Sequence, residues 1–597
     1  MSKQKLELTW IGKEKRPKLE PRILVEDPDK SYHAAQRMTE NDQFDNRLIF
    51  GDNLLALKAL EQEFAGKVKC IYIDPPFNTG AAFEYYDDGL EHSIWLGLMR
   101  DRLEILRSLL SVDGVAWVHI DDKELAYLRV VCDEIFGRTN FLNMIVVKTS
   151  DPSGHKTVNP SPYSQTEYIL MYAKDRTHYT YESTYVASAY DSGYNKLITN
   201  IDRPYSEWEV VGLNEHVALS LGYQDTREAR KKMGRVGFDS VVAQFALEHA
   251  GSVFQSTAIS NAAGRAIVEV RDESARCPGV VFHVPRADYE DIYVLNGRQV
   301  YFYSSKVRIL DGEATPAKPL TNLWTDIPWN GIAREGGVEF KNGKKPERLI
   351  ERCIELSSEK GDIILDSFAG SGTTGAVAHK MGRRWIMVEL GEHCHTHIIP
   401  RMHKVIDGED QGGISRAVDW KGGGGFRYYK LAPSLIVDDR WGNPVINPEY
   451  DAAQLAEALS KLEGFIYAPS ETRWWQHGHS SERDFLYVTT QNLSAAQLQA
   501  LSEEVGADNS LLVCCAAFRG PNADEAAQRW PNLTLKKIPK MVLARCEWGH
   551  DDYSLNVANL PMVEPEPKPV HDHPPAKAGR KRKPADLQDG LFAEDEA

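Results

Sequence analysis

An aspartate and two prolines stand directly after an apolar run in the segment CIYIDPPFNTG, residues 70–80. The apolar run predicts a buried strand that ends at Asp74. Because proline fixes φ and has no N–H, Pro75 and Pro76 stop a strand abruptly and hold the following Phe77 in place. By itself, such a sequence is also what ends an ordinary strand with a solvated carboxylate. A catalytic role for Asp74 therefore requires a second functional motif that the fold brings beside it.

A glycine-rich turn is the second candidate motif. Residues 370–375, GSGTTG, match the pattern G-x-G-x-x-G, follow the predicted strand DIILD and open a predicted helix. Glycines at these positions permit tight turning of the backbone and close approach of a ligand. Glu389 ends the next predicted strand, and an acid at that place can accept both hydroxyl groups of a ribose. The pattern predicts a cofactor that contains adenosine, with NAD as one option.

Two further residues narrow the choice of cofactor. Asp366 ends the strand before the glycine turn, and Phe368 comes just before its glycines. Together with DPPF, the sequence FAGSGTT resembles the S-adenosylmethionine-dependent amino-methyltransferases that act on DNA. In that family DPPF is the catalytic motif and FAGSGTT the cofactor motif. The resemblance thus implies S-adenosyl-L-methionine as the cofactor, with no metal required for methyl transfer.

Carried over position by position, the resemblance implies the catalytic residues Asp74, Pro75, Pro76 and Phe77. The cofactor residues that it implies are Asp52, Lys345, Asp366, Phe368, Ala369, Gly370, Ser371, Gly372, Thr373 and Glu389.

The chemistry of this family explains why an acid and two prolines follow the strand in the DPPF segment. The exocyclic amino nitrogen of adenine is a poor nucleophile because its lone pair is delocalised into the ring. The Asp74 carboxylate and the Pro75 carbonyl form an acceptor pair for its two N–H bonds, which favours a pyramidal nitrogen with its lone pair facing the methyl donor. Phe77 can stack on a base that is flipped out of the duplex.

Other functions stay open at this point. In the family, Asp at the start of the motif favours adenine, whereas related cytosine-N4 enzymes typically begin with Ser. A cytosine-ring enzyme would need a Pro-Cys nucleophile, and the nearest pair here, Cys277-Pro278, is reversed. A non-catalytic DNA-recognition subunit of the same fold is an alternative from another class. A nicotinamide dehydrogenase would leave DPPF unexplained.

The order of the motifs points to a subgroup. DPPF precedes FAGSGTT, as in the circularly permuted β-class enzymes, whose target recognition domain separates the two halves. Within the family, the long chain, the GHKT sequence at 154–157 and the extra C-terminal module resemble the modification subunits of type III restriction systems. The resemblance implies double-stranded DNA as the substrate. It leaves a second copy of the chain and a restriction or helicase subunit open as partners.

Strands and helices must alternate to position these motifs. Short apolar runs at 48–50, 68–73 and 115–120 alternate with amphipathic segments, and the segment 93–110 has apolar residues at helical spacing. Such alternation predicts a parallel sheet covered by helices on both faces. The rhythm breaks at about residue 180 and resumes at Pro346.

The resulting prediction is an α/β, Rossmann-like methyltransferase with an inserted mixed α/β recognition domain and a C-terminal α/β module. The boundaries we predict are an N-terminal arm (1–45), a catalytic half (46–180), a target recognition domain (181–320), a cofactor half (321–430), a C-terminal module (431–560) and a disordered tail (561–597).

Composition sets the remaining expectations. The 597 residues are 42% hydrophobic and 26% charged, with a net charge of −16. The net charge argues against a nucleic-acid partner, but a basic groove can lie on an acidic protein. The segment TREARKKMGR, 226–235, is a candidate for phosphate contacts and equally for an ordinary solvated helix. No apolar run suits a membrane span or signal peptide, and none of the eight cysteines forms a CxxC pair. The expected location is the cytoplasm.

Overall fold

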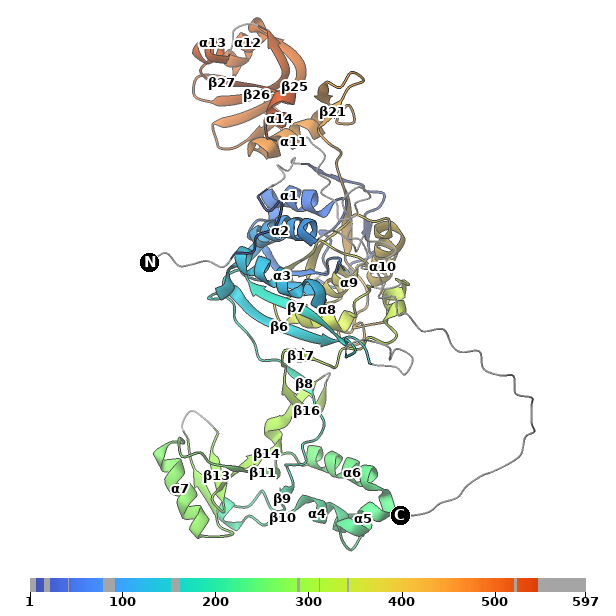
Figure 1. Ribbon diagram of the computed structural model, residues 1–597, viewed down its shortest axis with the longest axis vertical. Helices are drawn as coiled ribbons and strands as arrows, with labels where there is room; N and C mark the ends of the chain where they lie inside the picture. The colour runs from blue at the N-terminus through green and yellow to red at the C-terminus, as the bar shows by residue number, and fades with distance from the viewer. Residues whose placement is uncertain are drawn as a thin grey trace, which may run out of the picture.

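The computed structural model describes residues 7–14, 22–40, 42–78, 92–151, 162–286, 290–310, 312–340, 343–519 and 523–545. The predicted tail, 561–597, and the GHKT sequence lie outside these ranges. A large central sheet carries an inserted module at one end and a C-terminal module at the other (Figure 1). Among the described residues, no helix combines the length and apolar character needed to cross a membrane.

The central sheet has eleven strands in the order β1-β20-β3-β19-β18-β4-β5-β7-β6-β17, with β2 also paired to β20. The six strands from β20 to β5 run parallel, and β7 is antiparallel to both β5 and β6. Their bounds are β1 Leu24–Glu26, β2 Tyr32–His33, β3 Asn46–Phe50, β4 Val68–Ile73, β5 Leu110–Ile120, β6 Phe141–Lys148, β7 Thr166–Ala173, β17 Leu323–Trp324, β18 Ile363–Asp366, β19 Arg384–Glu389 and β20 Gly425–Leu431.

Helices cover both faces of this sheet. Alternate residues of β4 point to opposite faces, so Ile71 and Ile73 join one hydrophobic cluster and Cys70 and Tyr72 the other. The first cluster is closed by α1 (Asn53–Phe64), α2 (His92–Leu109) and α3 (Asp122–Cys132). The second is closed by α8 (Glu347–Glu355), α9 (Thr373–Lys380) and α10 (Ile399–Ile406). A sheet buried on both faces explains why its parallel strands are continuous apolar runs.

The helix after β5 ends earlier than its sequence pattern predicts. The amphipathic pattern predicts a helix over 123–137, but α3 ends at Cys132 and a π-helical turn, Asp133–Gly137, follows. Gly137 has a φ of 91°, which a glycine adopts without strain. The chain then enters β6 through a short 3₁₀ turn, Arg138–Asn140.

The order of the strands creates a switch point in the sheet. From β4 the chain continues through α2 to β5 on one side, whereas from β18 it continues through α9 to β19 on the other side. The loops that leave the adjacent strands β4 and β18 therefore diverge. In open α/β sheets, ligands bind in the crevice that such diverging loops leave at the carboxyl ends of the strands.

The inserted module contains two antiparallel sheets and four helices. Its six-stranded sheet has the order β10-β9-β11-β14-β13-β12, and the sheet β15-β16-β8 lies between it and the central sheet (Figure 1). The strands are β8 Tyr185–Ala187, β9 Lys196–Ile198, β10 Val210–Gly212, β11 Val253–Ala258, β12 Val281–Val284, β13 Ile292–Leu295, β14 Arg298–Phe302, β15 Val307–Leu310 and β16 Glu313–Pro319; the helices are α4 Leu213–Ser220, α5 Thr226–Met233, α6 Arg235–Glu248 and α7 Arg265–Arg276.

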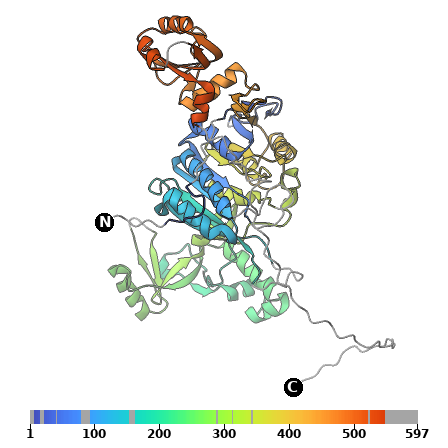
Figure 2. The same cartoon turned by 45° about the horizontal axis from the view of Figure 1, so that its top comes forward.

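The C-terminal module forms a separate layer of strands and helices (Figure 2). Its sheet has the order β23-β24-β25-β26-β27, in which the last three strands are parallel. Ile23 joins the hydrophobic cluster of this module, so the N-terminal segment ties it to the central sheet. The elements are β21 Ile436–Asp438, β22 Pro444–Ile446, α11 Ala452–Glu463, β23 Ile466–Tyr467, β24 Gly478–His479, β25 Asp484–Ser494, α12 Ala495–Val505, β26 Ser510–Arg519, α13 Ala523–Arg529, β27 Leu533–Lys537 and α14 Ile538–Arg545.

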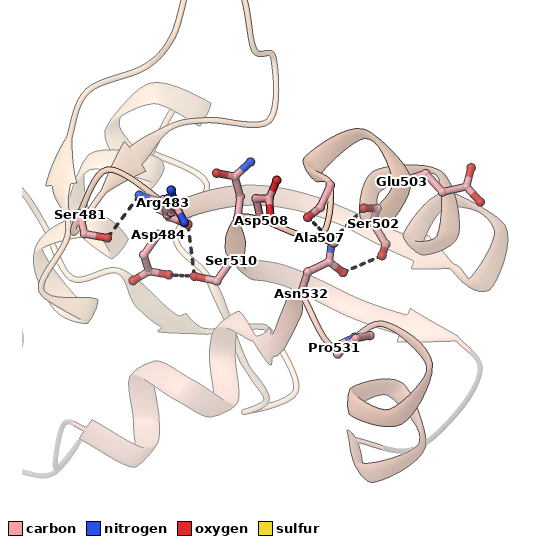
Figure 3. Close-up of a pocket in the computed structure, with 12 residues that line it drawn as sticks. Ser481, Arg483, Asp484, Ser502, Glu503, Ala507, Asp508, Ser510, Pro531 and Asn532 are labelled. Atoms are coloured by element: carbon pink, nitrogen blue, oxygen red, sulfur yellow. Dashed lines mark hydrogen bonds between the residues drawn. The ribbon is translucent and has the colours of Figure 1, made fainter.

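A polar hollow lies on the C-terminal module (Figure 3). It is lined by Asp484, Ser510 and Asn532, which stand at the amino ends of β25, β26 and β27. Parallel α/β sheets bind ligands outside the carboxyl ends of their strands. The hollow is therefore at the opposite edge from the one that such a fold uses for binding.

Candidate active site

The DPPF and glycine motifs lie side by side at one edge of the central sheet. Strands β18 and β4 are parallel neighbours, with Ile364 opposite Cys70 and Leu365 opposite Ile71. Asp366 and Asp74 thus leave the carboxyl ends of adjacent strands, at the switch point. Segments almost three hundred positions apart meet there, as the sequence requires for a shared site.

Asp74 has one bound and one free carboxylate oxygen. Its Oδ2 lies 3.0 Å from Nζ of Lys345. Its Oδ1 is buried, lies 3.9 Å from Nδ1 of His119, and accepts no hydrogen bond within the described part of the chain. Because a buried carboxylate oxygen normally has a donor, this atom is suited to receive one from a ligand.

The side chains of Glu167 and Tyr72 complete this cluster around Asp74. Nε2 of His119 lies 2.8 Å from Oε2 of Glu167, and Nζ of Lys345 lies 3.5 Å from the same oxygen. The hydroxyl of Tyr72 is 2.8 Å from Nδ1 of His119. Burial keeps that hydroxyl protonated by raising the pKa of Tyr72 well above its ordinary value. A protonated hydroxyl can donate to Nδ1 or accept from its N–H, so this contact ties Tyr72 to His119 in either ring tautomer.

Burial and pairing act against each other in the pKa values of this cluster. Burial raises the pKa of Asp74 above its ordinary value, in part offset by Lys345 and His119. Burial would also raise the pKa of Glu167, but Lys345 and His119 outweigh it and lower that pKa to about 2. Burial would lower the pKa of Lys345, and the two carboxylates outweigh it and raise that pKa. Glu167 and Lys345 are consequently an ion pair at neutral pH.

The rest of DPPF is held from two sides. The indole N–H of Trp95 in α2 donates to the carbonyl of Pro76 at 3.0 Å, and Pro75 is buried. The ring of Phe77 lies 5.8 Å from that of His119, with Nζ of Lys345 at 4.7 Å from its centroid. A half-buried aromatic ring thus lies next to His119 and Lys345, the two side chains that flank Asp74.

Asp366 organises the glycine turn. Its Oδ1 accepts the N–H of Phe368 at 2.9 Å, and its Oδ2 accepts the hydroxyl of Thr374 at 2.6 Å. Burial raises the pKa of Asp366 to about 7. Gly370 and Gly372 have left-handed φ values of 52° and 75°, which an L-residue rarely adopts. The carboxylate therefore fixes the turn from inside and α9 begins directly after it.

Glu389 faces the same turn from the end of β19. Its Oε2 accepts the N–H of Gly370 at 2.8 Å, and its Oε1 accepts those of Leu390 and Gly391 at 2.9 and 3.0 Å. The side chain is buried. Three backbone N–H groups, together with Nε2 of His393 at 3.1 Å from Oε1, therefore hold this acid in one orientation.

Asp52 lies in a third loop at the same edge, after β3. Its carboxylate accepts the N–H of Leu55 as the N-cap of α1, and Arg102 lies 3.4 Å from its other oxygen. The next residue, Asn53, donates to the carbonyl of Ser367 at 2.7 Å. The loops after β3, β18 and β19 are thus joined around one crevice.

The chain matches a known family over most of the segment that builds this site. The family model for DNA methylases matches residues 68–400, more than half of the chain. The chain belongs to the DNA methylase family. That match spans both the DPPF strand and the glycine turn.

The similar proteins of this family include restriction-modification subunits. The Haemophilus influenzae protein named "Probable type III restriction-modification enzyme HindVI Mod subunit" is 36% identical over 433 residues, which are 68% of this chain and 56% of that protein. The EcoP15I Mod subunit of a type III enzyme from Escherichia coli is 24% identical over 90% of both chains. The chain thus spans only about half of the first relative and nearly all of the second.

One solved structure with its ligand is also similar. It is the Thermus thermophilus protein titled "Putative DNA Modification Methylase", complexed with S-adenosyl-L-methionine, at 16% identity. The similarity covers 65% of this chain and 100% of that protein, with a TM-score of 0.29.

Among the predicted cofactor residues, Lys345 is one whose charged group lies beside the DPPF motif. The resemblance groups it with the cofactor residues, but its ammonium lies on Asp74 and Glu167. Lys345 stands directly before Pro346 and α8, a helix that packs on the same face of β4 as Cys70 and Tyr72. Ser371 and Thr373 lie in the turn but face α10: the Arg401 guanidinium donates to the Ser371 carbonyl and to the Thr373 hydroxyl. Ala369 donates its N–H to Val388 of β19.

Sequence reasoning missed His119 and Glu167. A signal for both was present, because each is a polar residue near the end of an apolar strand: His119 in VAWVHI and Glu167 in TEYILMYA. What the sequence does not contain is the pairing of β7 antiparallel to β5, which brings the two side chains together.

Proposed function

We propose that this chain is a site-specific DNA methyltransferase that transfers a methyl group from S-adenosyl-L-methionine to the N6 amino group of adenine in double-stranded DNA. The observation that carries the proposal is the juxtaposition of DPPF and the glycine turn at the β4–β18 switch point. The free Oδ1 of Asp74 supports it, because methyl transfer to an amino group needs a hydrogen-bond acceptor there.

The residues around the glycine turn fit the cofactor. A Cβ built on Gly370 would meet nothing nearer than the carbonyl of Phe368 at 3.8 Å, so the turn has space above it. Helix α9 begins at Thr373, directly after this turn, and a helix N-terminus favours an anionic group such as a carboxylate. In this proposal Glu389 accepts the ribose hydroxyls of the cofactor, and Asp52 is the acid that approaches its adenine. We assign Asp366, Phe368, Ala369, Ser371, Gly372 and Thr373 to the shape of this cradle.

When bound, the cofactor supplies a methyl group made electrophilic by a sulfonium sulfur. The residues of the chain act on the other reactant. The Asp74 carboxylate and the Pro75 carbonyl accept the two N–H bonds of the target amino group and direct its lone pair away from the base ring. Phe77 stacks on the flipped base. Once methylated, the nitrogen is cationic and loses a proton, for which Oδ1 of Asp74 is the acceptor.

We further propose that the chain is the modification subunit of a type III restriction-modification system. The similarity to the EcoP15I Mod subunit over 90% of both chains supports this assignment. In this proposal the methyltransferase fold is circularly permuted, the insertion 181–320 reads the DNA sequence, and the module 431–560 contacts a second copy or a restriction subunit. Phosphate contacts of α5 belong to the same proposal.

Sequencing of native DNA tests the base and the site together. We expect a host that lacks adenine methylation to acquire N6-methyladenine at one recognition sequence when it expresses the chain, and none with Asp74→Ala. Single-molecule sequencing gives the position, and mass spectrometry of nucleosides identifies the base. N4-methylcytosine would correct the base assignment. Cofactor binding with no methylated DNA would instead favour a non-catalytic recognition subunit.

A further inference from the structure

A buried cluster of charges supports Asp74 from behind. Lys345 bridges two carboxylates, at 3.0 Å from Oδ2 of Asp74 and 3.5 Å from Oε2 of Glu167, and His119 touches the second carboxylate at 2.8 Å. The three partners come from separate elements: β5, β7 and the segment before α8. The Lys345 and His119 side chains are 8% and 0% exposed.

Such a cluster is not explained by stability alone. Burying ions costs free energy that their mutual attraction often fails to recover, and well-packed apolar side chains would stabilise the same place as well or better. Charge clusters that persist in a crevice at the edge of a sheet therefore point to a role in the chemistry done there.

The geometry indicates what this role is. A carboxylate has two oxygens, and Lys345 occupies only Oδ2 of Asp74, on the side away from the free Oδ1. A single ion pair fixes the rotation of the carboxylate about its χ2 bond. The other oxygen, Oδ1, is thereby held in one direction while it remains available to accept a hydrogen bond from a ligand.

We propose that Lys345 and Glu167 are positioning residues for methyl transfer: Lys345 fixes Oδ2 of Asp74 so that Oδ1 faces the target amino group, and Glu167, held by His119, limits how strongly Lys345 binds Asp74. This inference rests on the proposed function of Asp74. It moves Lys345 from the cofactor to the catalytic carboxylate.

The arrangement makes the two positioning residues act in opposite directions. Without Lys345, Asp74 faces the like charge of Glu167 in a buried place, and the pKa of Asp74 rises. Without the charge of Glu167, the Lys345 ammonium interacts with Asp74 alone and the repulsion from Glu167 is removed. The pKa of Asp74 therefore falls. The described titratable groups that face Asp74 or act on it are Tyr72 of β4, His119 of β5, Glu167 of β7, Asp366 of β18 and Lys345 before α8.

The test is the pH dependence of methyl transfer by the full-length chain. Tritiated S-adenosyl-L-methionine and genomic DNA from a host without adenine methylation serve as substrates, so no recognition sequence need be known. If catalysis needs ionised Asp74, the rate rises with pH through its pKa. We expect Lys345→Met to move this rise to higher pH and to lower kcat roughly 100-fold. We expect Glu167→Gln to move it to lower pH.

Two further variants separate positioning from folding. Lys345→Arg keeps the charge and is expected to restore the position of the rise, with a smaller loss of kcat. Lys69→Met removes the ammonium that pairs with Asp113 at 2.5 Å at the other end of β4, and is the matched control expected to leave the profile unchanged. Circular dichroism with thermal unfolding checks that each variant is folded, and calorimetry measures its cofactor binding separately.

Each result decides one way. Shifts of the two pH profiles in the same direction, or no shift in either, overturn the inference. So does a Lys345→Met variant that loses cofactor binding with an unchanged profile, because Lys345 is then a cofactor residue. If Lys345→Met does not fold, the shift of the isosteric Glu167→Gln still decides. A wild-type chain that methylates no DNA contradicts the proposed function itself, a result distinct from all of these.

Discussion

The residues at the sheet edge are held by backbone as much as by side chains. Glu389 accepts three N–H groups, Asp366 accepts one N–H and one hydroxyl, and Asp52 caps a helix. Acids held in this way need little reorganisation to receive a ligand, which favours binding. Substitution of these acids should therefore change cofactor affinity and the free energy of unfolding by amounts that can be measured separately.

Glu389→Gln should weaken cofactor binding at least about tenfold, because a charged acceptor of ribose hydroxyls becomes neutral and keeps only one acceptor oxygen. The unmatched backbone N–H groups should also cost about 1–3 kcal/mol of unfolding free energy. Calorimetric titration with S-adenosyl-L-methionine measures the first effect, and chemical denaturation the second. The control is Glu392→Gln, three positions later, where the side chain is 83% exposed. Equal affinities for the two variants would remove Glu389 from the cofactor site.

Asp366 gives a prediction on pH and stability. Its pKa is raised by burial from 3.8 to about 7 in the folded chain, so the folded state binds its proton more tightly than the unfolded state. The sign follows: this group favours folding below pH 3.8 and loses that contribution as the pH rises through about 7. In Asp366→Asn the amide has no such titration and can still bond to Phe368 and Thr374. We expect a flatter dependence of unfolding free energy on pH across this window, measured by denaturant titration. A slope equal to that of the wild type would contradict the assigned pKa.

At the scale of elements, α2 acts as a support for the catalytic loop. Trp95 is fully buried in this helix and its N–H is bonded to Pro76. Trp95→Phe removes the donor and part of the ring volume, so DPPF loses a fixed point. We expect kcat to fall about tenfold with cofactor affinity unchanged, measured by steady-state kinetics and calorimetry. The control is Trp474→Phe, on the C-terminal module, where the indole is 57% exposed. An unchanged kcat would show that the prolines alone hold the loop.

Some elements of the fold can be predicted from the sequence and others cannot. β4 spans Val68–Ile73, the range that its apolar run predicts, because a strand buried on both faces has a simple local pattern. The run AIVEV in the insertion is too short to distinguish a strand from a helix, and it lies in α7. Local pattern also gives the motifs at the ends of β4 and β18. It does not give the antiparallel place of β7, and with it the contact of His119 with Glu167, because strand pairing is decided by the whole sheet.

At the scale of the whole molecule, the net charge of −16 conflicts with a DNA substrate unless cations are concentrated where DNA binds. In the proposed function, helix α5 of the inserted module is the candidate for such a place, because its second half carries Arg230, Lys231 and Lys232. Arg230 is paired with Asp239 at 2.9 Å, whereas Lys231 and Lys232 are exposed. Together with Arg227, which is also exposed, the two lysines are the cations of this helix that phosphates can reach with least competition.

The salt dependence of DNA binding can test this role of α5 without a known recognition sequence. Each phosphate that a cation neutralises adds about 0.9 to the slope of log affinity against log salt concentration. We expect Lys231→Ala with Lys232→Ala to lower that slope by about 1–2 and to weaken binding to any duplex, measured by fluorescence anisotropy over a salt series. Lys461→Ala, which removes a lysine paired with Glu457 in the C-terminal module, is the control and should leave the slope unchanged. An unchanged slope in the double variant would mean that α5 is an ordinary solvated helix, and that the acidic chain meets DNA through another surface.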